Sequence, residues 1–125
     1  MAEKPKILLV EDEMPVAKAM MLLLARAGCD TQVATNGAEA IHMAQQDNFS
    51  LITLDWDLPD VNGPDLCRRL KEIPSLSGTP VVFVTAREEI QNGLKAGAVD
   101  FITKPFEACD FLSRISSLVT KNAIA

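Results

Sequence analysis

Cysteine and histidine are scarce in this sequence of 125 residues. The three cysteines, Cys29, Cys67 and Cys109, are widely spaced, so they form no zinc-ligand pair. We expect them to be reduced thiols in a cytoplasmic protein, where most of them serve as packing groups. The single histidine, His42, has no acidic or thiol neighbour in the sequence, which predicts a surface position.

The chain also lacks an excess of positive charge and has no long apolar run. The net charge of −5 disfavours contact with phosphate backbones, so we do not expect this domain to bind nucleic acid. No apolar stretch approaches the length of a membrane span, and the polar start from Met1 to Lys6 shows no signal peptide. No repeat, linker or low-complexity segment divides the chain. We therefore expect a single domain over residues 1–125, with a core from about residue 5 to residue 121.

The sequence does contain short apolar runs that each end in a polar side chain. Hydrophobic residues make up 48% of the chain, enough to cover a sheet on both faces. Continuous runs of this length are typical of parallel strands that are buried on both faces. Four such runs, over residues 7–10, 51–54, 81–84 and 101–103, lead respectively into Glu11 and Asp12, Asp55, Thr85 and Lys104.

Helical patterns alternate with these runs. Pro15 fits the first turn of a helix whose apolar stripe ends before Gly28, and Asn36 can cap the next helix. Further helices are predicted over residues 66–73, 88–96 and 111–119, and a weaker edge strand over residues 31–35. The fold class predicted is α/β, a doubly wound five-stranded parallel sheet in the order 2-1-3-4-5 with five helices on two faces.

The polar groups that follow the strands should converge, because ligands of open parallel sheets bind at the carboxyl ends of the strands. Glu11, Asp12 and Asp55 fit the preference of Mg²⁺ for a few carboxylates, with several positions left to water and substrate phosphate. An aspartate can also act as a nucleophile toward phosphorus. Lys104 can offset charge on a transferring phosphoryl group, and Thr85 can donate a hydrogen bond to it.

These residues resemble the receiver domain of two-component response regulators, which has the flavodoxin-like fold of the bacterial chemotaxis regulator. The likeness covers nearly the whole chain. Each motif is weak alone, but the ordered set is specific. The motifs are Glu11-Asp12, the segment Asp55-Trp56-Asp57-Leu58-Pro59 with Gly63 downstream, Val84-Thr85-Ala86, and the run from Ala96 to Phe106 that contains Lys104-Pro105.

The resemblance implies a chemistry for this set. Asp55 would accept a phosphoryl group from the phosphohistidine of a sensor histidine kinase or phosphotransfer protein. Glu11, Asp12, Asp55 and the backbone carbonyl of Asp57 would bind Mg²⁺, and Thr85 and Lys104 would contact the phosphoryl group. Such a protein catalyses only its own phosphorylation and dephosphorylation, so it is not an enzyme in the ordinary sense. No output domain is expected in this chain.

The resemblance also implies a conformational switch. Thr85 would move toward the phosphate and Phe101 would turn inward behind it, which biases a two-state surface. From the residues alone, Phe101 fits a simple core position better. Two interpretations of Trp56 stay open: it is either a half-exposed packing residue or a contact near the site. The family also usually has a cis bond before Pro105.

Two departures from the family pattern, at Glu11 and in the stretch before Lys104, bear on function. Glu11 replaces the commoner Asp and lengthens one metal-binding arm. The stretch from Thr85 to Lys104 is shorter than usual by about one helical turn. A phosphorylation-dependent dimer is possible in this family, but the short stretch argues against its standard interface on the fourth helix, fifth strand and fifth helix. Asp57 and Arg87 occupy positions that tune phosphoryl loss, and we expect them to pair across the mouth of the site and hinder water.

Two alternatives stay open. Asp55-Trp56-Asp57 imitates the Asp-x-Asp motif of haloacid-dehalogenase phosphohydrolases, with Thr85 and Lys104 in the right order. That family, however, places an acidic pair downstream of its lysine, and this chain has no such pair. The second alternative is a degenerate receiver that only binds partners, and the complete set of site residues argues against it.

Overall fold

The computed structural model describes residues 4–87 and 90–124, and strands alternate with helices throughout. The strands are β1 (Lys6–Val10), β2 (Asp30–Ala34), β3 (Leu51–Leu54), β4 (Val81–Thr85) and β5 (Asp100–Thr103). The helices are α1 (Met14–Arg26), α2 (Gly37–Gln46), α3 (Gly63–Lys71), α4 (Ile90–Lys95) and α5 (Ala108–Ile124), with a short 3₁₀ helix, η1 (Pro74–Leu76), before β4.

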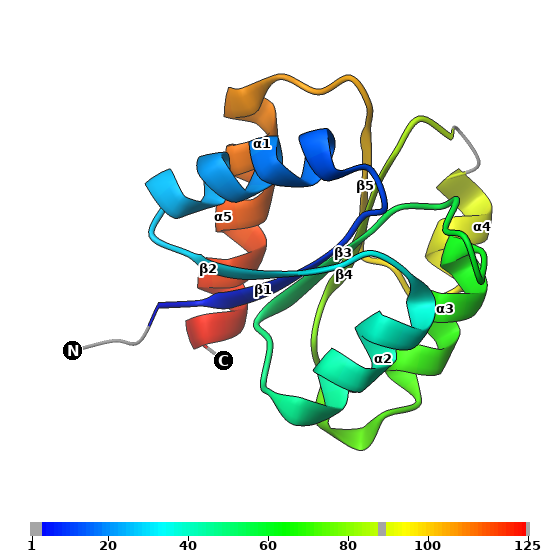
Figure 1. The fold of residues 1–125 in the computed structure, drawn as a ribbon. Coiled ribbons are helices and arrows are strands. Elements are labelled where there is room, and N and C mark those ends of the chain that lie inside the picture. Colours follow the sequence, from blue (N-terminus) through cyan, green and yellow to red (C-terminus); the bar gives the residue numbers. More distant parts are fainter. Residues whose placement is uncertain (1–3, 88–89, 125) are drawn as a thin grey trace.

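The sheet is parallel and has the strand order β2-β1-β3-β4-β5, which confirms the predicted topology. Helices α1 and α5 cover one face, and α2, α3 and α4 cover the other (Figure 1). Val10 of β1 is in register with Leu54 of β3, and Leu54 with Phe83 of β4. This register brings the residues that follow β1 and β3 to the same edge of the sheet.

The core consists of two apolar layers, one on each side of the sheet, because successive side chains of a strand point to opposite faces. Leu8 and Val10 belong to the layer under α2, α3 and α4, whereas Ile7 and Leu9 belong to the layer under α1 and α5. All four are at most 1% exposed. The continuous apolar runs of the sequence are therefore explained by strands that are buried on both faces.

Most element ends follow the predicted signals. Pro15 lies in the first turn of α1, and Gly28 follows that helix with φ +83°, a left-handed conformation that favours glycine. The third helix begins earlier than predicted, at Gly63, because the Asn62 side chain caps it. The predicted start of the fourth helix at Glu88 lies outside the described residues, within which α4 covers the six residues Ile90–Lys95.

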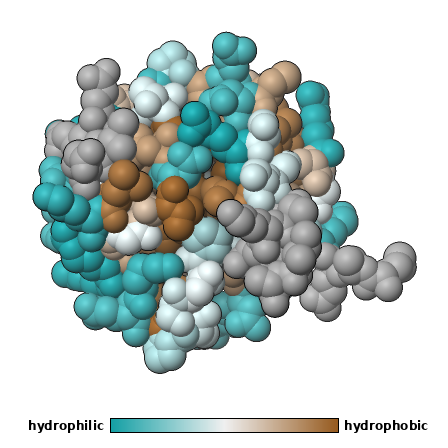
Figure 2. All heavy atoms as spheres, turned by 180° about the vertical axis from the view of Figure 1, so that it is seen from behind, coloured by the Kyte–Doolittle hydropathy of each residue, from teal (hydrophilic) through white to brown (hydrophobic). Residues whose placement is uncertain are grey.

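The surface is mostly hydrophilic but carries some apolar side chains, which Figure 2 shows on the face opposite to Figure 1. Within residues 4–87 and 90–124, the large apolar side chains that are exposed include Met14, Leu22, Leu94 and Val99. None of the helices in that part of the chain combines the length and the apolar character needed to span a bilayer.

Candidate functional site

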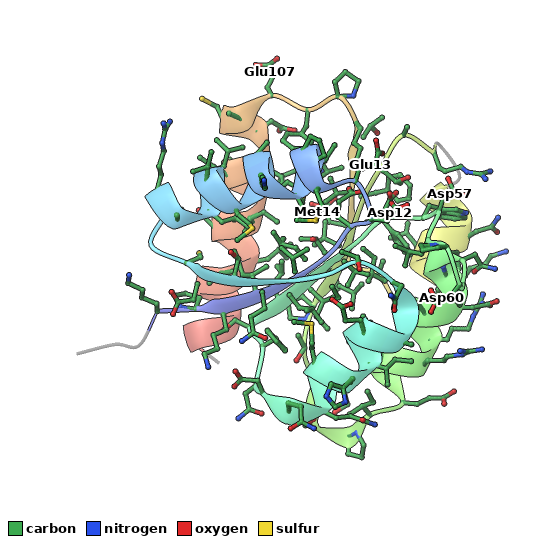
Figure 3. The ribbon with its side chains drawn as sticks, in the orientation of Figure 1. Asp12, Glu13, Met14, Asp57, Asp60 and Glu107 are labelled. Atoms are coloured by element: carbon green, nitrogen blue, oxygen red, sulfur yellow. The ribbon has the colours of Figure 1, made fainter. Side chains whose placement is uncertain are left out.

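The candidate site lies at the carboxyl edge of the sheet, where the strand ladder continues for one residue beyond β1 and β3. The N–H of Glu11 donates to the carbonyl of Ala34 (3.0 Å), and the N–H of Asp55 donates to the carbonyl of Val10 (3.0 Å). Asp12, Glu13 and Asp57 lie at this same edge (Figure 3). Backbone hydrogen bonds of the sheet therefore hold Glu11 and Asp55 in place.

Three carboxylates meet there, as predicted. Glu11, Asp12 and Asp55 each offer one carboxylate oxygen, and these oxygens lie within 4.8 Å of one another. Glu11 is 2% exposed and Asp55 is 7% exposed, whereas Asp12 is open to solvent. Asp12 and Asp55 line a cavity of about 240 Å³ that Thr85 and Lys104 also line. Buried carboxylates this close repel one another unless a cation offsets their charge.

Lys104 supplies such a cation. Its Nζ donates to Glu11 Oε1 at 2.5 Å and lies 3.6 Å from Asp55 Oδ2. The backbone N–H of Lys104 donates to the carbonyl of Thr85 (2.9 Å), which continues the β4–β5 ladder. The bond between Lys104 and Pro105 is cis, as the resemblance implied. Asp12, Asp55, Thr85 and Lys104 therefore line one cavity, and the fifth predicted residue, Glu11, reaches it through its ion pair with Lys104.

Burial and pairing shift the protonation of the two groups in this pair. Burial raises the pKa of Glu11 to about 7, against the opposing hydrogen bond from Lys104, and the neighbouring carboxylate of Asp55 adds to the rise. Burial opposes the charge on Lys104, but its hydrogen bond to Glu11 and the carboxylate of Asp55 outweigh burial and raise its pKa. Glu11 is thus the member of the pair that titrates near neutral pH.

The hydroxyl of Thr85 and the carboxylate of Asp55 are each held by a backbone N–H. Trp56 N–H donates to Asp55 Oδ1 (2.8 Å), and Arg87 N–H donates to Thr85 Oγ1 (3.3 Å). Thr85 is 1% exposed and lines the same cavity as Asp55. A phosphoryl group on Asp55 would therefore lie in the cavity that the Thr85 hydroxyl borders.

Asp57 and Arg87 form the expected ion pair beside this cavity. Arg87 Nη2 donates to Asp57 Oδ1 (2.8 Å) and Arg87 Nε donates to Asp57 Oδ2 (3.1 Å), a bidentate arrangement. The hydrogen bonds from Arg87 hold the pKa of Asp57 below its usual range. The pair links the loop after β3 to the segment after β4.

Phe101 and Trp56 lie in one aromatic cluster behind the site. The ring centroids of Trp56 and Phe83 are 5.2 Å apart, those of Phe83 and Phe101 are 5.8 Å apart, and those of Trp56 and Phe101 are 6.2 Å apart. Trp56 is buried, at 6% exposure, which decides between its two open interpretations in favour of a contact near the site. Phe101 is 8% exposed in this cluster.

Sequence reasoning missed Glu13, which lines the cavity beside Asp12. Its N–H donates to Glu11 Oε2 (3.2 Å), so it also helps to fix the orientation of the Glu11 carboxylate. The signal was visible as a third consecutive acidic residue after the first apolar run, but only the folded loop shows that Glu13 faces the cavity.

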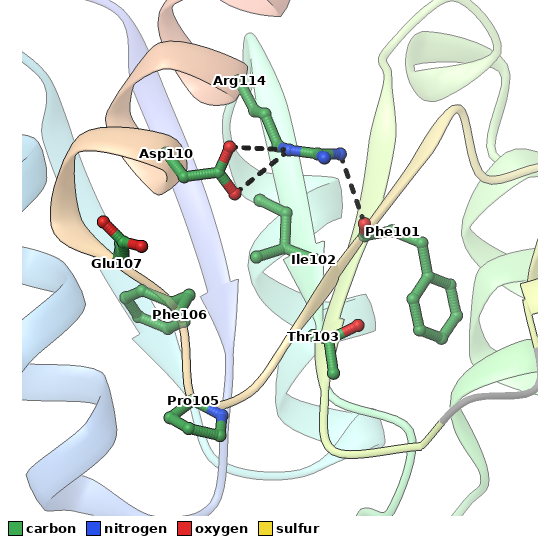
Figure 4. Close-up of a pocket in the computed structure, with 8 residues that line it drawn as sticks. All are labelled: Phe101, Ile102, Thr103, Pro105, Phe106, Glu107, Asp110 and Arg114. Carbon is green, nitrogen blue, oxygen red and sulfur yellow. Dashed lines mark hydrogen bonds and ion pairs between the residues drawn. The ribbon is translucent and has the colours of Figure 1, made fainter.

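A second cavity, of about 400 Å³, lies along β5 and the start of α5 (Figure 4). Arg114 occupies one side, where its Nη1 donates to Asp100 (2.9 Å) and its Nε pairs with Asp110 (3.3 Å). Neither Asp55 nor Lys104 lines this cavity. The chemistry predicted for the chain therefore belongs to the Asp55 cavity.

The donor set around Asp55 fits a magnesium ion. The three carboxylate oxygens are hard ligands from two adjacent strand ends, and Asp12 keeps one side of the cluster open for water. Glu11 and Asp55 also share the partly buried cation Lys104, which shows that the fold already balances negative charge at this position.

Comparison with known proteins agrees with this geometry. The sequence matches the family described as the response regulator receiver domain over residues 7–116. It is 39% identical over 123 residues to the uncharacterized transcriptional regulatory protein YkoG of Bacillus subtilis, which covers 96% of this chain and 53% of that protein. It is 36% identical over 121 residues to the transcriptional regulatory protein CusR of Escherichia coli, with coverage of 94% and 52%. The chain thus spans about half the length of these relatives.

Solved structures show the same fold. The receiver domain of a signal transduction histidine kinase from Syntrophus aciditrophicus has a TM-score of 0.86 and 32% identity, covering 94% of this chain and 91% of that one. A putative response regulator from Chloroflexus aurantiacus has a TM-score of 0.88 and 29% identity, covering 94% and 98%.

Proposed function

This chain belongs to the response regulator receiver domain family, and on that premise we propose that it is a signalling switch that accepts a phosphoryl group on Asp55. The observation that carries the proposal is the convergence of three carboxylates, one hydroxyl and one ammonium at the carboxyl edge of the sheet. Residues 1–125 would act as one receiver domain, with a core from about residue 5 to residue 121.

In the proposed reaction, a carboxylate oxygen of Asp55 attacks the phosphorus of a phosphohistidine. The new oxygen–phosphorus bond replaces the nitrogen–phosphorus bond, and the histidine nitrogen leaves with its electron pair. Lys104, which is 3.6 Å from Asp55, would bind a phosphoryl oxygen, and Thr85 would donate a hydrogen bond to another. The chain thus catalyses its own phosphorylation.

Glu11, Asp12 and Asp55, with the backbone carbonyl of Asp57, would hold Mg²⁺ beside the phosphoryl group. When bound, the cation supplies positive charge that offsets the charge of the phosphoryl oxygens.

The output of the switch would be a changed surface. Thr85 would shift toward the phosphoryl group, and the aromatic cluster that contains Phe101 would adjust with it. The donor would be a sensor histidine kinase or a phosphotransfer protein. Curated relatives are named transcriptional regulatory proteins, which supports an effector that controls transcription, either in the same chain or in a partner.

The test is incubation of the protein with Mg²⁺ and a small acyl phosphate, followed by intact mass measurement. We expect the mass of one added phosphoryl group in the wild type and none in the Asp55→Asn variant. Labelling that persists in Asp55→Asn, or that does not need Mg²⁺, would contradict the proposal.

The phosphohydrolase alternative requires Asp57 as a proton donor beside Asp55. Both carboxylate oxygens of Asp57 instead accept hydrogen bonds from Arg87, which lowers its pKa and disfavours proton donation. Family membership and this pairing together support the phosphoacceptor over the hydrolase. The complete residue set likewise supports it over a module that only binds partners.

Asp57 and Arg87 would slow hydrolysis of the phosphorylated form. Asp57 lines the cavity, and its ion pair with Arg87 would restrict the approach of water to Asp55. We expect Arg87→Ala to shorten the phosphorylated half-life, measured by intact mass after removal of the acyl phosphate. An unchanged half-life would reject this role.

A further inference from the structure

The loop over residues 57–62, which follows Asp55 and Trp56, is closed on itself at its base. The N–H of Gly63 donates to the carbonyl of Trp56 (2.6 Å), and Asp57 and Asn62 form an isolated antiparallel bridge. The base is also close to the phosphoacceptor, since a Cβ added at Gly63 would lie 2.8 Å from the carbonyl oxygen of Asp55. A displacement of this loop would therefore also displace the backbone at Asp55.

The tip of the loop is bound to the start of α2 through Asp60. Asp60 Oδ1 accepts from the N–H of Gly37 (2.7 Å), and Asp60 Oδ2 accepts from the N–H of Ala38 (3.0 Å). Amides in the first turn of a helix have no partner within the helix, and the dipole of α2 favours a carboxylate there. These hydrogen bonds hold the pKa of Asp60 below its usual range. Figure 3 shows Asp60 beside the start of α2.

The approach of the loop to α2 depends on Gly37. A Cβ at this position would overlap Cγ1 of Val61 and would lie 3.2 Å from Asp60 Oδ1. Val61 also packs against the apolar layer under α2, α3 and α4. The tether therefore has a polar part at Asp60 and a steric part at Val61, and the missing side chain of Gly37 permits both.

We propose that Asp60 is a positioning residue of the phosphoacceptor site, because its tether to α2 holds the loop whose first residue, Asp57, offers its backbone carbonyl to the divalent cation. This inference rests on the proposed function. Mg²⁺ demands near-ideal octahedral geometry, so a loop that is free to move weakens the site even when every ligand is present. Asp60 itself lies at the tip of the loop and is not one of the predicted ligands.

The test is a Mg²⁺ titration in which the fluorescence of Trp56 reports binding. Trp56 is the single tryptophan, and its backbone N–H donates to the carboxylate of Asp55. We expect Asp60→Ala to raise the dissociation constant for Mg²⁺ about tenfold, the lower end of the range for residues that orient metal ligands. The matched control is Asp47→Ala, which removes the same charge at the other end of α2, where Asp47 pairs with Lys6 (2.7 Å). We expect that control to bind Mg²⁺ like the wild type.

Further variants separate positioning from general damage to the fold. Gly37→Ala breaks the same tether from the side of the helix and is expected to weaken Mg²⁺ binding as well. Asp60→Asn keeps one acceptor oxygen and is expected to have an intermediate affinity. Saturating Mg²⁺ is expected to restore full phosphorylation of Asp60→Ala by the acyl phosphate, because Asp55, Thr85 and Lys104 are intact.

The inference is overturned if Asp60→Ala binds Mg²⁺ within about twofold of the wild type, or if Asp47→Ala is weakened equally. A wild type that neither binds Mg²⁺ nor gains a phosphoryl group would instead overturn the proposed function. The two failures are therefore distinguishable in the same set of proteins.

Discussion

Two cation–carboxylate pairs adjoin the Asp55 cavity: Lys104–Glu11, which we call the floor pair because it is largely buried, and Arg87–Asp57, which we call the mouth pair because it is exposed. At the floor, Lys104 is 15% exposed and Glu11 is 2% exposed. At the mouth, the corresponding values are 47% for Arg87 and 64% for Asp57. The first pair has lost most of its hydration, whereas the second remains in water.

This difference decides what each pair can do. A buried pair has a large effect when one partner is removed, because the other charge is left without water or a counter-ion. An exposed pair contributes little to stability, because water and salt screen it. The Lys104–Glu11 pair therefore controls protonation and stability at the site, whereas the Arg87–Asp57 pair is suited to controlling access.

Lys104→Met tests the floor of the cavity and should have the largest effect. The variant leaves Glu11 buried without its cation, so we expect the free energy of unfolding to fall by about 3 kcal/mol at about pH 8. Denaturant unfolding in the presence of a chelator measures it. Lys18→Met, which changes an exposed lysine on α1, is the control and should have little effect.

Adding Glu11→Gln to Lys104→Met should recover more than half of that loss, because the buried charge is then absent. A loss below about 1 kcal/mol for Lys104→Met alone would show that the floor pair behaves like an exposed one, and the comparison would fail.

The pH dependence of stability tests the same pair with an expected effect of about 2 kcal/mol. The folded-state pKa of Glu11, about 7, lies above the ordinary value of a glutamate, so the folded state binds the proton more tightly than the unfolded state. The resulting stability is fully present below the unfolded-state pKa and is lost as the pH rises through 7. In a chelator, the wild type should therefore lose stability between about pH 5 and pH 8 relative to Glu11→Gln. Parallel pH profiles for the two proteins would contradict the raised pKa.

A double-mutant cycle of Arg87→Ala and Asp57→Ala tests the mouth of the cavity and should give the smallest effect. We expect a coupling free energy below about 1 kcal/mol, which decreases further at high salt. Unfolding experiments on the four proteins at low and high salt measure it. A coupling above about 2 kcal/mol would mean that the mouth pair also holds the fold together.

Most of the fold was predictable because its signals are local. Apolar runs such as residues 7–10 and 51–54 read as strands buried on both faces, and their order along the chain led to the correct topology. The start of α3 at Gly63 was missed, because the signal for it is the cap that Asn62 makes in a loop dense in turn residues. The short η1 was missed as well, since Pro74 was interpreted only as a break after the third helix.

The candidate site was predictable in its members and in the Asp57–Arg87 pair, but not in its other contacts. Glu11, Asp12, Asp55, Thr85 and Lys104 were identified from their places at strand ends. The burial of Trp56 in an aromatic cluster was not predicted, because it depends on Phe83 and Phe101 from two other strands. The tether of Asp60 was not predicted either, because its partners lie on α2, more than 20 residues earlier in the chain.

By itself, the sequence determined which polar groups stand at the ends of which strands, because apolar periodicity and turn residues act over a few neighbouring positions. Only the tertiary structure decided which of those groups contact one another. It placed the Lys104 ammonium 2.5 Å from Glu11 and 3.6 Å from Asp55, and it bound Asp60 to the start of α2. These contacts depend on distances between elements that are remote in the chain and on how much water each position retains. Neither quantity can be predicted from the local sequence.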